Sequence, residues 1–182
     1  MPRGATGIGV CCVSLPGAVL FACTQNKVRS PLAAALLRLR HGRALRLGHG
    51  VRITDDLDIE QSGTAQRVVL GPLAEWVRDR RIALEICPTS NVHTNAFDRF
   101  GSTITEHPFD LLYQLGFAVT VNTDNRLMSG TSLSREIANL AEVFGYDLND
   151  VLQWQLSAAD AAFLPSEDRD ELADFLVAAY TR

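Results

Sequence analysis

Arg46-Leu-Gly-His-Gly50, Cys87-Pro-Thr-Ser-Asn-Val92 and Val121-Asn-Thr-Asp-Asn125 are the stretches of this sequence that decide its fold. Each follows an apolar run and places chemically capable side chains directly after it, and segments with a helical pattern separate them. Strands that alternate with helices pair in parallel through right-handed crossovers. Because an α/β barrel carries its working residues at the carboxyl ends of successive strands, the pattern predicts that arrangement.

The chain after residue 44 predicts an α/β fold with three strands, at residues 45–48, 82–86 and 117–121. Helices are expected at residues 64–80, 108–115, 134–144, 148–158 and 167–180. A closed barrel needs about 200 residues or more, so we expect a partial (β/α)8 TIM barrel made of the last three β/α units and the C-terminal helices. Such a sheet would leave two open edges and an uncovered apolar interior face, which favours self-association.

A shorter unit precedes these strands. Residues 18–22 predict a buried strand, residues 24–30 a polar turn, and a helix begins at Pro31, where the missing N–H group costs nothing. We therefore expect two parts, with residues 1–44 as a strand–loop–helix appendage and residues 45–182 as the partial barrel.

The composition excludes several classes of partner. Of the 182 residues 47% are hydrophobic and 21% are charged, the balance of a soluble globular protein, and the net charge of −4 gives no basic field for nucleic acid. The longest apolar stretch, residues 7–22, is interrupted and too short to span a bilayer. The four cysteines form no Cys-x-x-Cys pair, which favours free thiols in the cytoplasm. They are Cys11, Cys12, Cys23 and Cys87.

Polar groups after the predicted strands are the candidate site residues. Asp124 follows a buried strand, where a carboxylate can ligate a divalent metal or act as a base, although Asp and Asn also favour caps of turns and helices. His49 lies between two glycines, which allow close approach of backbone and substrate, and the alternative is a structural histidine. Residues 87–91 either supply hydroxyl and amide groups to the site or form a polar turn with a buried free cysteine.

In their order and spacing, the three stretches resemble the C-terminal part of the adenosine deaminase family, from Arg46 to the end of the chain. The segment Leu-Met-Ser-Gly-Thr-Ser-Leu-Ser after Asn125 strengthens the resemblance. It implies a zinc-dependent (β/α)8 barrel that hydrolyses adenosine, a purine nucleoside, to inosine. It further implies that His49 positions the attacking hydroxide, that Asp124 ligates zinc (Zn2+), and that Asn125 contacts the purine. Zinc lowers the pKa of its bound water to about 7 and so supplies hydroxide.

Other residues that the resemblance implies have no counterpart here. The family's His-x-His pair and His-Ala-Gly-Glu motif do not occur, so three metal ligands and the proton-donating glutamate are missing. Glu85 lies within a predicted strand and does not match that glutamate. His93 and His107 lie between two predicted strands, and we expect both to be solvated loop residues.

A second motif lies in the N-terminal part. Cys23-Thr-Gln-Asn-Lys-Val-Arg29-Ser30 forms a Cys-x5-Arg loop between the predicted strand and helix. Backbone N–H groups at a helix start bind oxyanions and depress a thiol pKa, Arg29 can grip a phosphate bidentately, and Ser30 can support the thiolate. With their flanking residues, residues 18–43 resemble the start of a low-molecular-weight protein tyrosine phosphatase. The Asp-Pro pair of that family's general acid does not occur.

Three functions remain open at this stage. The first is zinc-dependent adenosine deamination by an incomplete catalytic domain. The second is phosphate-monoester hydrolysis through Cys23 and Arg29. The third is a catalytically inactive fusion fragment.

Overall fold

The computed structural model describes residues 14–15, 18–21, 44–62 and 65–181. The predicted loop at residues 24–30 and the helix that begins at Pro31 lie outside the described residues. The elements follow in the order β1 (Ser14–Leu15), β2 (Ala18–Phe21), β3 (Ala44–Gly48), η1 (Gly50–Asp56), β4 (Leu57–Ser62), β5 (Ala65–Leu70), α2 (Pro72–Asp79), β6 (Ala83–Ile86), α3 (Pro88–His93), η2 (Ile104–Glu106), α4 (Phe109–Gln114), β7 (Val119–Val121), α5 (Arg126–Ser129), α6 (Leu133–Phe144), α7 (Leu148–Asp160) and α8 (Ser166–Tyr180).

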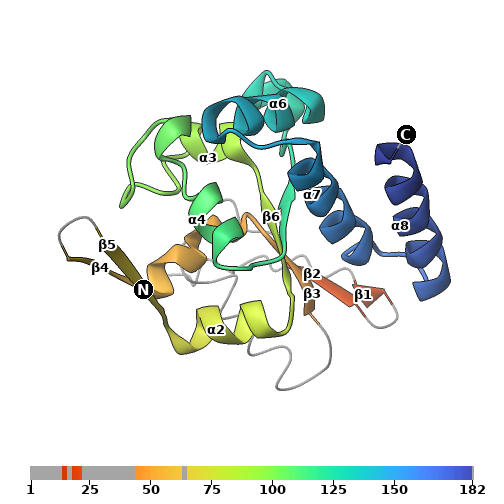
Figure 1. Ribbon diagram of the computed structural model, residues 1–182, viewed down its shortest axis with the longest axis horizontal. Coiled ribbons are helices and arrows are strands. Elements are labelled where there is room, and N and C mark those ends of the chain that lie inside the picture. The colour runs from red at the N-terminus through yellow and green to blue at the C-terminus, as the bar shows by residue number, and fades with distance from the viewer. Residues whose placement is uncertain (1–13, 16–17, 22–43, 63–64, 182) are drawn as a thin grey trace, which may run out of the picture.

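A five-stranded sheet in the order β1-β2-β3-β6-β7 runs through the middle of the molecule (Figure 1). Strands β2, β3, β6 and β7 are parallel, and β1 is antiparallel to β2. The three strands predicted after residue 44 are confirmed as neighbours in the expected order. Strand β2 occupies the edge of β3 that was expected to be open, so the N-terminal strand belongs to the same sheet.

Helices cover one face of this sheet, and that face forms the core. Successive residues of a strand point to opposite faces, and the large apolar side chains of β3, β6 and β7 in the core point to the helical side. These positions are Leu47, Leu84, Ile86, Val119 and Val121. Helices α2, α4 and α7 supply buried partners that include Val77, Leu112 and Trp154. Although β7 ends the sheet in the described part of the chain, its three residues are buried.

The opposite face of the same strands is polar, so the prediction of an apolar interior face was wrong for the described strands. Arg46, Glu85 and Thr120 alternate with the core residues and share this face. Arg46 Nε lies 3.1 Å from Glu85 Oε1, and the guanidinium stacks 3.5 Å from the centre of the Phe163 ring. Asn122 Nδ2 donates a hydrogen bond of 2.8 Å to Thr120 Oγ1. The large apolar core residues of these strands point to the helical side, and Ala83 is a small apolar residue that shares the face of Arg46.

Residues 64–80 do not form the single helix that their spacing predicts. Strand β5 pairs antiparallel with β4, and only α2 is helical. Adjacent β-branched residues, Val68 and Val69, favour a strand. Pro72 begins α2 and disfavours helical backbone at the residue before it, Gly71, so the strand and the helix separate there.

The remaining predicted helices agree with the structure to within two residues at each end. Ser132 and Asp147 cap the starts of α6 and α7 by accepting hydrogen bonds from backbone N–H groups. Gly145 ends α6 with a φ of 74°, a left-handed conformation that glycine adopts without strain. Helix α8 lies beside α7 at one side of the molecule (Figure 1).

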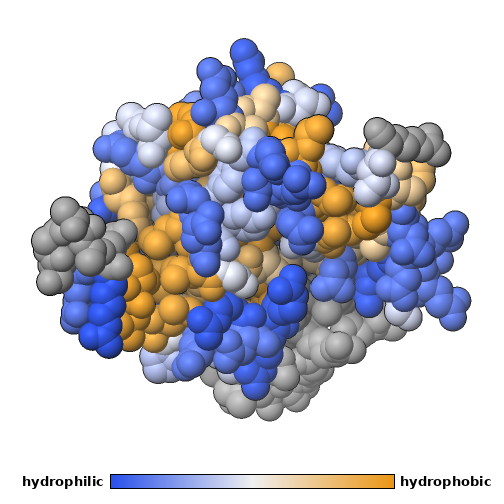
Figure 2. All heavy atoms as spheres, in the orientation of Figure 1, coloured by the Kyte–Doolittle hydropathy of each residue, from blue (hydrophilic) through white to orange (hydrophobic). Residues whose placement is uncertain are grey.

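Apolar side chains gather in two places on the face shown in Figure 2, beside the β4–β5 hairpin and where α7 lies beside α8. Exposed large apolar side chains on α5 and α8 include Leu127, Met128, Phe175, Val177 and Tyr180. In the part of the chain that the structure describes, no helix has both the length and the apolar character needed to cross a membrane.

Candidate active site

The three sequence stretches meet at the carboxyl end of the sheet. Strands β3, β6 and β7 are adjacent and parallel, so the residues that follow them lie at one edge. His49 follows β3 directly, Cys87 follows β6 directly, and Asp124 lies three residues after β7. The structure therefore brings together the residues that the sequence placed after separate strands.

His49 and Asp124 face each other across this edge. The distance from His49 Nε2 to Asp124 Oδ1 is 3.8 Å, longer than a hydrogen bond but short enough for both groups to contact one ligand. Their side chains are 22% and 37% exposed, so solvent reaches both. Each residue has a φ of 53°, a left-handed conformation that is uncommon for residues with a Cβ atom and that clusters at functional sites.

Gly50 allows the close approach that the glycines beside His49 predict. A Cβ atom at Gly50 would lie 2.7 Å from Leu84 Cδ2 and 3.2 Å from Leu84 Cα. The backbone after β3 therefore passes directly against β6, and no side chain fits between them. This contact fixes the start of η1 and, one residue earlier, the position of His49.

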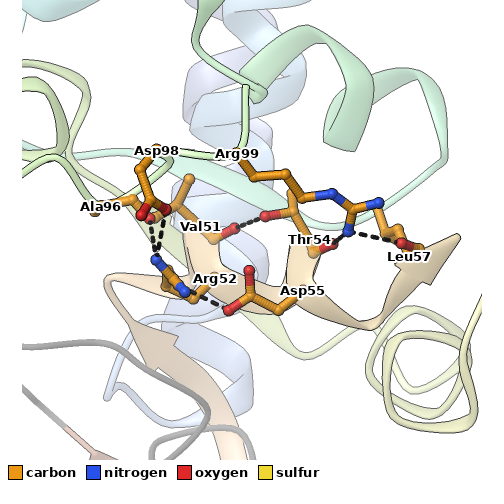
Figure 3. Close-up of polar contacts among 8 residues, drawn as sticks. All are labelled: Val51, Arg52, Thr54, Asp55, Leu57, Ala96, Asp98 and Arg99. Atoms are coloured by element: carbon orange, nitrogen blue, oxygen red, sulfur yellow. Dashed lines mark hydrogen bonds and ion pairs between the residues drawn. The ribbon is translucent and has the colours of Figure 1, made fainter. Parts of the chain in front are cut away.

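Two arginines hold η1 against the loop that follows α3 (Figure 3). Arg52 Nη1 donates to Asp98 Oδ1 at 3.1 Å, and its Nε donates to a carboxylate within η1. Arg99 Nη1 reaches back from the loop and donates to the backbone carbonyls of Thr54 and Leu57, at 3.2 and 2.9 Å. The segment after His49 is thus fixed at both ends by charged donors.

Ser90 orients the Asp124 carboxylate. Its Oγ atom donates a hydrogen bond of 2.7 Å to Asp124 Oδ2, and the serine is only 5% exposed. Since Oδ2 is engaged by Ser90, Oδ1 is the oxygen that faces His49. The sequence predicted that residues 87–91 could supply hydroxyl and amide groups to the site, but it did not single out Ser90.

Cys87 is a buried free thiol, as one interpretation of its stretch predicted, but the polar turn of that interpretation was wrong because Pro88–His93 form helix α3. Burial raises the pKa of Cys87 to about 12, and the nearby carboxylates of Asp124 and Glu85 add to this, against a hydrogen bond from the backbone N–H of Asp124. The thiol is therefore neutral at physiological pH. A neutral thiol is a poor nucleophile.

Asn125 caps the short helix α5. Its Oδ1 atom accepts hydrogen bonds of 3.1 Å from the backbone N–H groups of Leu127 and Met128. The Asn125 oxygen therefore caps the start of α5, which is the alternative role that the sequence left open for Asp and Asn in this stretch. A ligand that contacts the exposed side chain of Asn125 would have to use its Nδ2 group.

The prediction that His107 is solvated was wrong, whereas His93 is exposed at the end of α3. His107 is 2% exposed, beside the Phe97 ring at 4.6 Å between centres. Its Nδ1 atom accepts from the Phe109 N–H group, so Nε2 carries the proton and faces Asn91 Oδ1 at 3.2 Å. Burial lowers the pKa of His107 to about 3. The residue is a neutral structural histidine.

The described residues do not by themselves fit a metal ion. Among them, no three or more His, Cys, Asp or Glu side chains are grouped in a way that could hold one. Hydrolytic zinc sites use three protein ligands and an open position. Asp124 and His49 offer two groups. The phosphate loop residues Cys23, Arg29 and Ser30 lie outside the described residues.

A family model described as adenosine deaminase matches residues 33–179. The chain therefore belongs to the adenosine deaminase family. The match begins within residues 18–43, the segment that resembles the start of a phosphatase.

The curated adenosine deaminase of Mycobacteroides abscessus is 49% identical over 132 residues, which cover 72% of this chain and 34% of the relative. The crystal structure of an adenine deaminase from Arthrobacter aurescens shares the fold with a TM-score of 0.69 at 18% identity, covering 90% of this chain and 43% of that one. An amidohydrolase from Burkholderia ambifaria, solved with bound Zn, gives a TM-score of 0.53 at 23% identity, with 80% and 38% covered. The chain spans about a third of the length of the curated relatives that it matches.

Proposed function

We propose that this chain carries part of the active site of a zinc-dependent adenosine deaminase, which hydrolyses adenosine to inosine. One observation carries the proposal. This chain belongs to the adenosine deaminase family, and its His49 Nε2 and Asp124 Oδ1 atoms face each other at 3.8 Å at the carboxyl end of the sheet.

Each site residue has a role in this proposal. Asp124 is the zinc ligand, and Ser90 leaves its Oδ1 atom directed toward the site. His49 is the hydrogen-bonding group that orients the attacking water. Asn125 contacts the purine ring through Nδ2, because its Oδ1 is engaged by α5. The metal ligands beyond Asp124 would come from outside the described residues or from another chain.

The wider arrangement is also a proposal. We infer that β3, β6 and β7 are the last three units of a (β/α)8 barrel, and that residues 1–44 form an N-terminal part whose strand β2 extends the same sheet beside β3. The adjacency of the three parallel strands and the likeness to solved deaminases support the first point. A purine nucleoside is the proposed substrate and the cytoplasm the proposed location.

The chain is also proposed to self-associate through the ends of the sheet. Sedimentation velocity at rising protein concentration tests this proposal.

A chimera tests the proposed function. The matched residues of this chain replace the corresponding third of the Mycobacteroides abscessus adenosine deaminase, which supplies the rest of the fold. Ultraviolet absorbance then follows the conversion of adenosine to inosine with zinc present.

We expect the chimera to turn over adenosine and Asp124→Asn to lower kcat/KM by about 10²-fold or more. Asparagine tolerates the left-handed backbone at this position, so the variant removes the charge and not the conformation. Asp160→Asn, which changes an exposed carboxylate at the end of α7, is the matched control. A folded, zinc-loaded chimera without turnover would favour the inactive-fragment alternative.

A further inference from the structure

Glu136 is a fully buried carboxylate in the first turn of α6. Its Oε2 atom accepts a hydrogen bond of 3.0 Å from the backbone N–H of Thr89. Its Oε1 atom is also buried and has no hydrogen-bond partner among the described residues. A buried carboxylate oxygen without a partner costs free energy, so packing alone does not explain a glutamate here.

The hydrogen bond from Thr89 fixes the start of α3. The first N–H groups of a helix have no partner within the helix. Cys87, at the N-cap of α3, provides no side-chain cap. Glu136 supplies the missing acceptor from another helix, 47 residues later in the chain. Helix α6 therefore holds the N-terminal turn of α3 in place.

The residue after Thr89 on α3 is Ser90, which holds the Asp124 carboxylate at 2.7 Å. Two hydrogen bonds and the peptide unit between Thr89 and Ser90 thus connect Glu136 to Asp124. We propose that Glu136 is a positioning residue, which anchors α3 so that Ser90 directs Asp124 toward His49. The purpose of this positioning rests on the proposed function. The positioning itself is measurable without zinc or substrate.

Nuclear magnetic resonance of the full chain tests this inference. The two signals to follow at neutral pH are the 13C shift of the Asp124 carboxyl carbon and the hydrogen-exchange rate of the Thr89 amide. Glu136→Leu removes the acceptor, and Glu136→Gln retains an oxygen that can accept the same bond. Glu136→Asp retains the charge but withdraws it from Thr89, and provides the comparison if the leucine variant does not fold. Glu142→Leu changes an exposed carboxylate on the same helix and is the matched control.

We expect Glu136→Leu or Glu136→Asp to move the Asp124 signal in the same direction as Ser90→Ala. Thr89 exchange should become about tenfold faster, the equivalent of one lost hydrogen bond. Glu136→Gln should restore both signals, and combining Glu136→Leu with Ser90→Ala should move the Asp124 signal no further than Ser90→Ala alone.

The inference is overturned if the Asp124 signal stays at its wild-type position in Glu136→Leu and Glu136→Asp while Ser90→Ala moves it. Additive shifts in the double variant also overturn it, because Glu136 would then act by a route other than Ser90. Failure of the chimera to deaminate adenosine has no effect on these signals. The two proposals can therefore fail separately.

Discussion

His49 and Asp124 both adopt a left-handed backbone, and each lies just past the end of a strand. Asp, Asn and His tolerate this conformation better than most residues with a Cβ atom. The direction of each side chain is therefore set by backbone geometry as well as by rotamer. For Asp124 the hydrogen bond from Ser90 adds a second constraint. Alanine at either position would combine the loss of the functional group with backbone strain, so asparagine is the more informative substitution.

Protonation of His107 is expected to destabilise the fold, because burial lowers its pKa to about 3 from the ordinary 6.5. Between these values the folded state binds fewer protons than the unfolded state. The stability that neutral His107 contributes is complete above pH 6.5 and is lost as the pH falls toward 3, by at most about 1.4 kcal/mol per pH unit. Urea unfolding at about pH 7.5 and about pH 5.5 measures this loss in the wild type and in His107→Gln.

We expect the wild type to lose about 1.4 kcal/mol more than His107→Gln between these two conditions. His93→Gln is the control, because His93 is exposed, and it should follow the wild type. Equal losses in the wild type and in His107→Gln would contradict the assignment of His107 as a buried neutral group.

At the scale of elements, the segment from β3 through η1 is held from two sides. Gly50 lies against Leu84 of β6, and Arg52 and Arg99 tie η1 to the loop after α3 (Figure 3). These contacts are made by the backbone and by charged donors, and they fix the turn that carries His49. The position of His49 therefore depends on groups that lie outside the candidate site.

Gly50→Ala is expected to lower the free energy of unfolding by about 1–3 kcal/mol, because the new Cβ would meet Leu84 at 2.7 Å. Urea denaturation provides the measurement. The cost should be smaller in a Leu84→Ala background, where part of the obstructing side chain is absent. An equal cost in both backgrounds would mean that the Leu84 atoms beyond Cβ are not what excludes a Cβ at Gly50, because the Leu84 Cβ stays in Leu84→Ala at 2.9 Å.

Arg99→Met is expected to lower the free energy of unfolding by about 1–2 kcal/mol, since it removes the donor of two hydrogen bonds to backbone carbonyls while keeping much of the side-chain stem. Arg78→Met is the matched control. Within the described residues, the Arg78 side chain pairs with the neighbouring Asp79 at the surface, an interaction of about 0–1 kcal/mol. Thermal unfolding compares the two, and equal effects would refute a special role for Arg99.

The helices after residue 130 were predictable because their apolar residues recur at helical spacing and polar caps such as Ser132 and Asp147 begin them. The β4–β5 hairpin was not predicted. Val68 and Val69 fit both a helical spacing and a strand, and pairing with β4 decides between the two. Tertiary contacts thus overrode local periodicity at this one segment.

The site was predictable to the extent that it lies at strand ends, which is how His49 and Asp124 were identified. The roles of Ser90 and Glu136 were not predictable from the sequence. Ser90 binds Asp124, 34 positions away, and Glu136 binds Thr89, 47 positions away. The burial of His107 depends on Asn91 and Phe97 coming together around it. A sequence of one chain does not display such long-range contacts.

At the scale of the whole molecule, the sheet has one face covered by helices and one polar face that carries the Arg46–Glu85 pair. In the proposed barrel this polar face would point inward, so the Arg46–Glu85 pair would join the neighbouring strands β3 and β6 on the inside. Phe163, between α7 and α8, stacks on Arg46 and ties the C-terminal segment to the same face. The C-terminal helices are thereby attached to the strands that carry the site.

The most direct test of the central claim, that His49 and Asp124 form one part of a deaminase site, is kcat for adenosine in the chimera. His49→Asn and Asp124→Asn should each lower kcat by about 10²–10⁴-fold. Because residues that act as a unit are not additive, the double variant should be no slower than the slower single variant. Values of kcat within about twofold of the parent chimera for either single variant, or strictly multiplicative losses in the double variant, would contradict the claim.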